Sequence, residues 1–538
     1  MDAIQTALAS GHAPLPPIDD RAEAEAILTR YGDALARRQP WESLWRDCYA
    51  HVLPQSGLFA GGVAGTRRGD TLFDATAADA ADQLAASLLA HLTPPWSRWA
   101  GLAPGPDLDG EERAAIAPLL EQAGAALQAQ IDRSNFAVEA HQAFLDVVTG
   151  GTACLLVEEA QPGGPSALRF TAIPLSELVL EDGGEGRLDT VFRRIALTGG
   201  EIARRFGRGL LPPTLAAQAD ADPQARFGLV EAVMPLDTIR GGGRRWAVVL
   251  EGEAPTLLAE GRFADSPFIA FRWMKAPGET YGRSPVMKAL PDIRTANKVV
   301  ELVLKNASIA VTGIWQADDD GVLNPAAIRL VPGTIIPKAV GSAGLTPLAS
   351  PGRFDVSQLV LDDLRARIRH ALLADRLGPV DGPRMTATEV LERSAEMARV
   401  LGATYGRLQA ELLVPLVRRC LSILRRRGEV PDIVADGRLV VVQILSPLAR
   451  AQAKRDGEAT LRWLESISAL GPEALAAVDL GAAARLLADA AGVPPALLRP
   501  LPTALPAGTK GVAAEPGALP TGPGMVPATT GREEGDDA

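Results

Sequence analysis

The sequence predicts an α+β protein that is mainly helical, and three observations support this class. Apolar residues recur at three- and four-residue steps over several long stretches, as on amphipathic helices. Residues 152–273 instead contain short β-branched and apolar runs separated by turn residues, as in strands. Only 4% of the residues are aromatic while 47% are hydrophobic. The core must therefore consist mainly of Ala, Leu and Val, which favours closely packed helices.

The first half of the chain is expected to begin with helices and to continue with strands. Residues 1–20 are Pro-rich and are expected to be flexible. Helices are predicted at residues 21–53, with a bend permitted at Pro40, at 76–92, capped by Asp74 or Thr76, and at 111–150, in two parts that meet near Asn135. A short helix is predicted at 198–206. The predicted strands are residues 152–159, 167–173, 177–182, 190–197, 227–234, 245–250 and 268–273.

The middle of the chain predicts two helices with a small β-rich insert between them. The first helix covers residues 286–313, and its cations recur at four and seven residues. The second covers residues 355–377 and carries a basic stripe with His370 opposite an apolar stripe. Between them, residues 314–354 contain prolines, glycines and short β-branched runs typical of strands and turns. The cations of these two stripes are Arg294, Lys298 and Lys305 on the first helix, and Arg365, Arg367 and Arg369 on the second.

The last third predicts a loop, one very long helix and a helical end. Residues 378–385 contain two Gly-Pro pairs that must end the preceding helix. Residues 386–428 form the long helix, which Pro415 should kink. Residues 429–446 read as a strand or hairpin and 447–499 as helices, with Ser446 as the first N-cap. Residues 500–538 are rich in Pro, Gly, Ala and Thr, a composition that predicts disorder.

Charge and cysteine content limit the classes of function. The formal net charge is −11 with a pI near 5.2, which argues against a protein whose whole surface binds nucleic acid. Cys48, Cys154 and Cys420 have no metal-like spacing, so reduced thiols in a cytosolic setting are expected. No signal peptide is expected, because a basic start followed by an apolar segment is lacking. Charges interrupt the most apolar helices, so no membrane span is expected.

No pattern of catalytic residues supports an enzyme. The five histidines lack metal-ligand spacing, and GxSxG, dinucleotide-binding, kinase and GxxxxGK[ST] patterns are missing. The acidic clusters 318–320 and 362–363 could bind Mg²⁺ in principle, but solvated turns and surfaces explain them better. The sequence therefore predicts a protein without enzymatic activity, cofactor or metal.

Several short motifs, in a fixed order over residues 30–500, identify a family resemblance. The chain resembles the portal proteins, or head-to-tail connectors, of short-tailed double-stranded DNA bacteriophages (podovirus type). No single motif is specific, and the resemblance rests on their order and spacing. The match weakens over residues 207–265 and ends near residue 500. The motifs are Trp41-x-x-x-Trp45 with Tyr49 and Pro54, residues 72–76 (LFDAT), 92–99 (LTPPWSRW), 151–153 (GTA), 278–285 (GETYGRSP), 385–390 (MTATEV), 411–416 (ELLVPL) and 446–449 (SPLA).

The resemblance implies a subunit with wing, stem, clip and crown regions that assembles into a ring, usually of twelve copies, around a central channel. Residues 21–285 would form an α+β wing, 286–313 and 355–377 the two stem helices, and 314–354 the clip. Residues 378–385 would form a tunnel loop, 386–428 a long wing helix, 429–446 a return to the wing and 447–499 the crown. The ring would sit at one capsid vertex in the virion, after assembly in the host cytoplasm.

The resemblance also implies partners and site residues. Double-stranded DNA would pass without sequence specificity, and the terminase large subunit, the major capsid and scaffolding proteins and a tail adaptor would dock. Because ring symmetry multiplies each side chain, a few cations per subunit suffice to coat a channel. Expected channel-lining cations are Arg294, Lys298, Lys305, Arg365 and Arg369. Expected tunnel-loop residues are Arg376, Gly378, Pro379, Val380, Asp381, Gly382, Pro383 and Arg384. Expected clip contacts are Trp315, Arg329, Lys338 and Arg353.

Four alternatives to these assignments follow from the residues alone. The cationic stripes are also compatible with ordinary solvated helix faces or with partners for Glu301, Asp362 and Asp363. Residues 378–385 are also compatible with a plain helix connector. An adaptor or scaffold protein that forms no ring is the main functional alternative. A nucleic-acid enzyme acting through Asp318 or Asp362 has no support from a recognisable motif.

Overall fold

The computed structural model describes residues 20–491 except 58, 60–68, 96, 185, 208–211, 237–242, 313–314, 318–344, 348–353, 378–400, 472–473 and 475–477. Within these residues the protein is α+β and mostly helical, as the sequence predicts. Its strands form four separate antiparallel sheets, and its buried side chains form three clusters.

The first cluster is a helical core. Its N-terminal helices are α2 (Asp20–Val52), α3 (Thr76–Leu92), α4 (Gly110–Asp132) and α5 (Phe136–Gly150), with 3-10 turns η1 (Pro54–Ser56) and η2 (Gly69–Thr71) between α2 and α3. These bounds confirm the predicted helices, including the junction near Asn135. Small residues of α3, such as Ala81 and Ala85, are fully buried and permit its close packing on α5.

A three-stranded sheet in the order β3-β2-β9 joins this helical core to the second cluster. Its strands are β2 (Thr152–Glu159), β3 (Leu168–Ile173) and β9 (Phe268–Arg272). Side chains of β2 alternate between the two clusters, with Leu155 and Val157 in the first and Cys154 and Leu156 in the second. Burial on both faces explains why β2 reads as a continuous apolar run.

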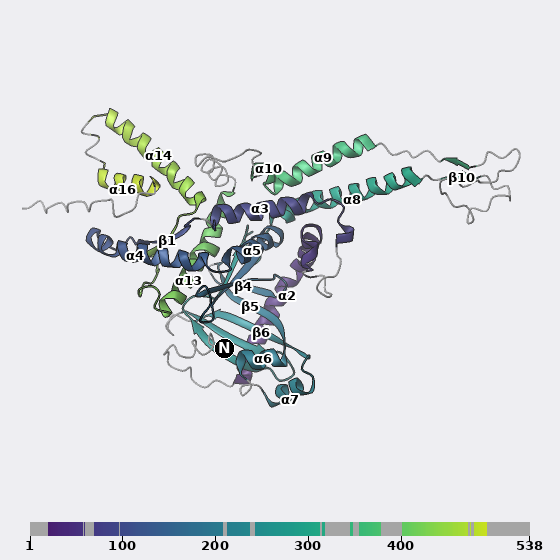
Figure 1. Cartoon of the computed structure of the whole chain (residues 1–538), viewed down its shortest axis with the longest axis horizontal. Coiled ribbons are helices and arrows are strands. Elements are labelled where there is room, and N and C mark those ends of the chain that lie inside the picture. The colour runs from purple at the N-terminus through teal and green to yellow at the C-terminus, as the bar shows by residue number, and fades with distance from the viewer. Residues whose placement is uncertain are drawn as a thin grey trace, which may run out of the picture. The chain divides into compact units, whose positions relative to one another are not determined.

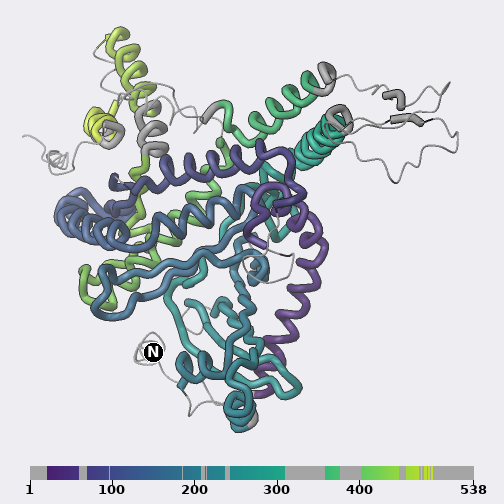
Figure 2. Tube along the Cα trace, turned by 45° about the vertical axis from the view of Figure 1, so that its right-hand side comes forward, coloured from purple at the N-terminus to yellow at the C-terminus, as the bar shows by residue number. Residues whose placement is uncertain are grey.

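The five-stranded sheet is a meander in the order β4-β5-β6-β7-β8. Its strands are β4 (Leu178–Asp182), β5 (Leu188–Thr198), β6 (Arg226–Pro235), β7 (Arg244–Leu250) and β8 (Thr256–Phe263). The N-terminal half of α2 packs on this sheet through Ile27, Tyr31 and Ala34 (Figure 2). Two short helices, α6 (Gly199–Phe206) and α7 (Pro213–Ala221), supply Phe206 and Leu215 to the second cluster. The sequence predicted neither β8 nor α7.

Two helices lie side by side and lead to a small β pair (Figure 1). They are α8 (Pro285–Thr312) and α9 (Phe354–Ala371), and a short α10 (Ala374–Leu377) follows. Strands β10 (Trp315–Ala317) and β11 (Leu345–Pro347) are antiparallel partners between them. This order confirms the predicted sequence of helix, β insert and returning helix.

The predicted long helix is interrupted in its described part. Gly402 has a φ of 44° and separates residue 401 from α12 (Ala403–Leu408). A π-helical turn, η6 (Gln409–Leu413), then precedes α13 (Val414–Arg426). Pro415 has no N–H for a regular helical bond and is the second residue of α13, one residue beyond this turn, consistent with the predicted irregularity. An unbroken helix over the whole range was therefore wrong, and residues 386–400 lie outside the described residues.

The C-terminal part contains a strand whose partner is distant in sequence. Strand β12 (Val440–Ile444) pairs with β1 (Ala100–Pro104), a strand that the sequence did not predict. The prediction of a strand at this place is confirmed, whereas the alternative of a local hairpin is wrong. Helices α14 (Pro447–Ala469) and α16 (Leu480–Ala491) pack on each other. None of the described helices is long and apolar enough to cross a membrane.

Candidate functional site

The pair of α8 and α9 divides into a buried base and an exposed far half. At the base, α8 buries Val286, Ile293 and Ala296, and α9 buries Leu364 and Ile368. The far half of α8 begins beyond Asn297, and that of α9 is the part that precedes the buried Leu361. There the apolar side chains that remain exposed are Leu302 (48%), Leu304 (53%), Leu359 (74%) and Val360 (44%).

The start of α8 is fixed to the end of α5 by a close backbone approach. Gly151 has a φ of 77°, and a Cβ atom there would lie 2.2 Å from the carbonyl oxygen of Gly282. A Cβ atom on Gly282 would lie 2.1 Å from the carbonyl oxygen of Gly151. The Gly282 N–H donates to Thr152 Oγ1 at 2.8 Å. Two separate sequence motifs, 151–153 and 278–285, therefore meet here, and only glycine fits at the contact.

Ser284 caps α8 and ties it to the same place. Its hydroxyl donates to the Thr149 carbonyl at 2.9 Å and accepts from the Met287 N–H at 2.9 Å. The side chain thus satisfies one of the free N–H groups at the helix start. Ser284 is itself buried, so this cap belongs to the core rather than to the surface.

A third motif, residues 72–76, connects α8 with α9. Asn297 of α8 accepts from the N–H groups of Phe73 (2.7 Å) and Asp74 (3.1 Å), and its amide donates to the Thr71 carbonyl. The buried Asp74 carboxylate accepts from the Thr76 N–H at 3.0 Å and from Arg365 of α9 at 2.8 Å. Burial alone would raise the pKa of Asp74, but these hydrogen bonds together lower it. We call residues 71–76, 149–152 and 278–287 with Asn297 and Arg365 the mount.

Arg272 joins the mount to the rest of the molecule. Its side chain is 1% exposed and donates to both carboxylate oxygens of Glu411, at 2.7 and 3.2 Å. It also donates to Asp182 at 3.2 Å and to the carbonyls of Thr280 and Gly186. One guanidinium therefore links β9, the β4–β5 turn, the 278–285 segment and the π turn. Through this contact, the motif at residues 411–416 (ELLVPL) is linked to the mount.

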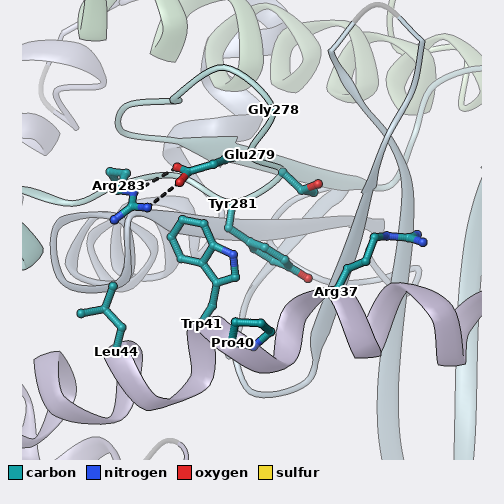
Figure 3. Close-up of a pocket in the computed structure, with 9 residues that line it drawn as sticks. Arg37, Pro40, Trp41, Leu44, Gly278, Glu279, Tyr281 and Arg283 are labelled. Carbon is teal, nitrogen blue, oxygen red and sulfur yellow. Dashed lines mark hydrogen bonds and ion pairs between the residues drawn. The ribbon is translucent and has the colours of Figure 1, made fainter.

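Beside the mount lies an open pocket of about 440 Å³ between α2 and the 278–285 turn (Figure 3). The Arg283 guanidinium lies 4.9 Å from the centre of the Trp41 ring and pairs with Glu279. Tyr281 is buried below, where its hydroxyl accepts from the Leu180 N–H, and burial raises its pKa to about 12. The pocket offers aromatic and charged contacts but no nucleophile next to a base. Its lining residues are Arg37, Pro40, Trp41, Leu44, Gly278, Glu279, Thr280, Tyr281 and Arg283.

Four of the five predicted channel cations already have acidic partners within the subunit. Arg294 pairs with Asp47 of α2, and Arg365 pairs with Asp74. Lys298 and Lys305 both pair with Glu301, at 2.9 and 2.6 Å. These pairs agree with the surface-helix interpretation for the isolated subunit.

Arg369 is exposed on α9, and no ion pair holds it among the residues that the structure describes. Its neighbour Arg367 pairs with Asp292 at 3.1 Å. The structure thus brings Lys298 and Lys305 together around Glu301. Arg294 contacts α2 and Arg365 contacts Asp74 of the mount. Arg369 joins neither group.

Most of the expected tunnel and clip residues lie outside the described residues. This holds for tunnel-loop residues 378–384, for the clip contacts Arg329, Lys338 and Arg353, and for the acidic cluster 318–320. Trp315 lies in strand β10 and Arg376 in α10. Asp362 and Asp363 are exposed on α9.

The described residues contain no group of three or more His, Cys, Asp or Glu side chains that could hold a metal ion. All three cysteines are buried, and burial raises the pKa of Cys48 and of Cys420 to about 12. Trp99 is buried and stacks on Phe136, with 5.7 Å between the ring centroids, so this indole belongs to the core. Trp96 lies outside the described residues.

Sequence reasoning missed Asn297 and Arg272. A single polar residue on a helix, or an arginine at the end of an apolar strand, gives no sign of a partner far away in the chain. The partnership of Glu301 was visible, since it lies three residues after Lys298 and four before Lys305.

Comparison with known proteins gives matches over most of the chain. A family model described as bacteriophage head to tail connecting protein matches residues 24–498. The probable portal protein of Bordetella phage BPP-1 is 26% identical over 510 residues, which cover 89% of this chain and 90% of the relative. The portal protein of Salmonella phage epsilon15 is 23% identical over 508 residues, covering 89% of each. A solved chain from the virion of a native gene transfer agent particle aligns with 13% identity over 76% of this chain and 94% of that chain, with a TM-score of 0.32.

Proposed function

The chain belongs to the family of bacteriophage head-to-tail connecting proteins, and from this premise we propose that its copies form a ring at one vertex of the capsid, with a bore that passes double-stranded DNA. It is a structural protein of the virion rather than an enzyme. The two full-length relatives are named portal proteins, one of them as probable. By analogy, the genome enters and leaves through this ring of about twelve copies.

In this proposal α8 and α9 form the stem around the bore. The observation that carries it is the contrast along the pair, with a base held by buried polar contacts and a far half whose cations and leucines face outward. A ring needs such a rigid base, because every subunit must present its helix pair at the same angle for the bore to close.

The bore should contact DNA weakly. Each phosphate neutralised by Lys or Arg strengthens binding in a salt-dependent way, and many such contacts would hold the duplex instead of letting it slide. A formal net charge of −11 with few basic side chains on α8 and α9 meets this requirement. Lys298 and Lys305 on the far half of α8 are the proposed contacts, together with Arg294, Arg365 and Arg369, which lie nearer the base.

The other regions receive roles by analogy with the family. Residues 314–354 form the clip that meets the terminase large subunit during packaging and the tail adaptor afterwards. Residues 378–385 form a loop that projects into the bore. Residues 447–499 form the crown, and the major capsid and scaffolding proteins dock on the ring.

Native mass spectrometry of the purified full chain, with class averages from electron microscopy, tests this function. We expect a closed ring of about twelve copies with an open centre. A stable monomer at high concentration, with no ring even after capsid or scaffolding protein is added, would contradict it and favour an adaptor that forms no ring.

A further inference from the structure

Glu301 lies on the far half of α8 between two of the proposed DNA contacts. Its Oε2 accepts from Lys298 Nζ at 2.9 Å and its Oε1 accepts from Lys305 Nζ at 2.6 Å. Both carboxylate oxygens are therefore occupied by lysines of the same helix. These hydrogen bonds lower the pKa of the Glu301 carboxyl, which keeps it charged near neutral pH.

The three side chains differ in exposure. The lysine side chains are 61% and 63% exposed, while that of Glu301 is 18% exposed. A phosphate arriving from solvent can thus reach both ammonium groups, but each already has an anionic partner. Such exposed pairs, three or four residues apart on one helix, are weak and exchange readily.

The acidic partners of Arg365 and Arg294 lie on other elements and have structural roles. Asp74 is buried, pairs with Arg365 and accepts from the Thr76 N–H, so its carboxylate is part of the mount. The N-cap position of α3 is Ala75, so the predicted cap by Asp74 or Thr76 was wrong. Asp47 pairs with Arg294 across the contact between α2 and α8. In contrast, the Glu301 pairs join no second element.

We propose that Glu301 is a brake on DNA binding: its carboxylate competes with the phosphates of the passing duplex for Lys298 and Lys305. This inference rests on the proposed function and adds to it a residue that sets how strongly the bore holds DNA. The competition is local and independent of sequence. In a ring it is repeated once per subunit, so a small effect at each Glu301 is multiplied.

Binding of a fluorescent duplex of about 40 base pairs to the full chain, at NaCl concentrations from about 50 to 200 mM, tests the brake. Glu301→Gln should bind about threefold to tenfold more tightly at low salt, because two lysines are released. The slope of log K against log salt should become steeper by about 1 to 2.

Glu279→Gln is the matched control. It raises the net charge by the same one unit and frees Arg283 from its pair, but on the turn before α8. We expect it to bind DNA as the wild type does. The double variant Lys298→Ala/Lys305→Ala should bind more weakly and with a shallower salt slope.

The outcomes separate the brake from the proposed function. If the double lysine variant weakens binding but Glu301→Gln matches Glu279→Gln, the lysines contact DNA and the brake is wrong. If the double lysine variant binds like the wild type, these lysines do not face DNA, and both the brake and their assignment to the bore fail. Ring formation, measured separately, would still stand in either case.

Discussion

The mount and the far half of α8 and α9 belong to the same two helices but are built in opposite ways. In the mount, the half-buried Asn297 and the buried Asp74 bond to segments that are distant in sequence, and Gly151 touches Gly282 through the backbone. In the far half, Glu301 bonds within its own helix, and leucines face outward. The mount is specified by contacts within one subunit, whereas the exposed far half is where we propose contacts with other molecules.

This difference gives the scattered family motifs a physical meaning. Residues 72–76, 151–153, 278–285 and 411–416 are far apart in the chain, yet they meet at the mount or at Arg272. Their contacts join the base of the helix pair to α2, α3, α5 and β9. Substitutions of the buried groups and close backbone contacts of the mount should therefore change stability, while those in the far half should change interactions.

The largest effect is expected at the glycine contact. Gly282→Ala places a methyl group against the carbonyl of Gly151, where both partners are backbone and cannot move aside. We expect a loss of more than about 4 kcal/mol in the free energy of unfolding, or no folded protein. Gly32→Ala on α2 has open space around it and should be neutral or slightly stabilising. Equal thermal stability of the two variants would refute the glycine contact.

The second largest loss of stability is expected at Arg272. Arg272→Met leaves Glu411 and Asp182 without their buried cation, which should cost about 3–5 kcal/mol in urea unfolding. Arg283→Met removes a half-exposed pair with Glu279 and should cost no more than about 1 kcal/mol. The link between the π turn and the mount would be in doubt if both variants unfolded at the same urea concentration.

A smaller effect, which depends on pH, is expected at Asp146. This carboxylate of α5 is buried, accepts from the Tyr49 hydroxyl at 2.9 Å, and has its pKa raised by burial to about 7. Between its unfolded pKa near 4 and about 7, the folded state keeps a proton that the unfolded state has lost, so stability falls as pH rises.

Asp146→Asn removes this titration. Relative to the wild type, the variant should gain about 2–3 kcal/mol of stability between pH 5 and pH 8. Asp33→Asn, at an exposed position of α2, should keep the pH dependence of the wild type. Parallel curves of melting temperature against pH for Asp146→Asn and the wild type would contradict the buried, protonated carboxyl.

The smallest effect compares two asparagines of α8. Asn297→Ala removes the acceptor for two N–H groups of the mount and should cost about 1–3 kcal/mol. Asn306→Ala, exposed in the far half, should stay within about 0.5 kcal/mol of the wild type. An equal cost at both positions would remove the distinction between mount and far half.

Local patterns predicted many elements closely but could not identify their partners. The bounds of α3 and β2 were predicted to the residue, because an Ala/Leu stripe and a continuous apolar run are local signals. The pairing of β12 with β1 was missed, since strand pairing depends on register between distant segments. Strand β8 was missed because its burial is mostly partial, which leaves a weak apolar pattern.

The same limit applies to the site. The cations of α8 and α9 were visible from their spacing, and so was Glu301 between two lysines. The roles of Asn297, Arg272 and the Gly151–Gly282 contact were not visible, because each depends on a tertiary approach. The assignments to the bore, the tunnel loop and the clip remain predictions, since they concern other copies of the chain or residues outside the described ones.

The most direct test of the account is site-specific crosslinking to DNA in the assembled ring. Leu302→Cys lies four residues after Lys298 and three before Lys305, and it keeps both cations. Val138→Cys lies on α5 at a position that is 73% exposed, and serves as the control. The buried native thiols should not react, because two have a pKa near 12. With a photoactivatable label on the new thiol, we predict crosslinks to duplex DNA from position 302 and none from position 138. Crosslinks from position 138 alone would contradict a bore lined by α8 and α9.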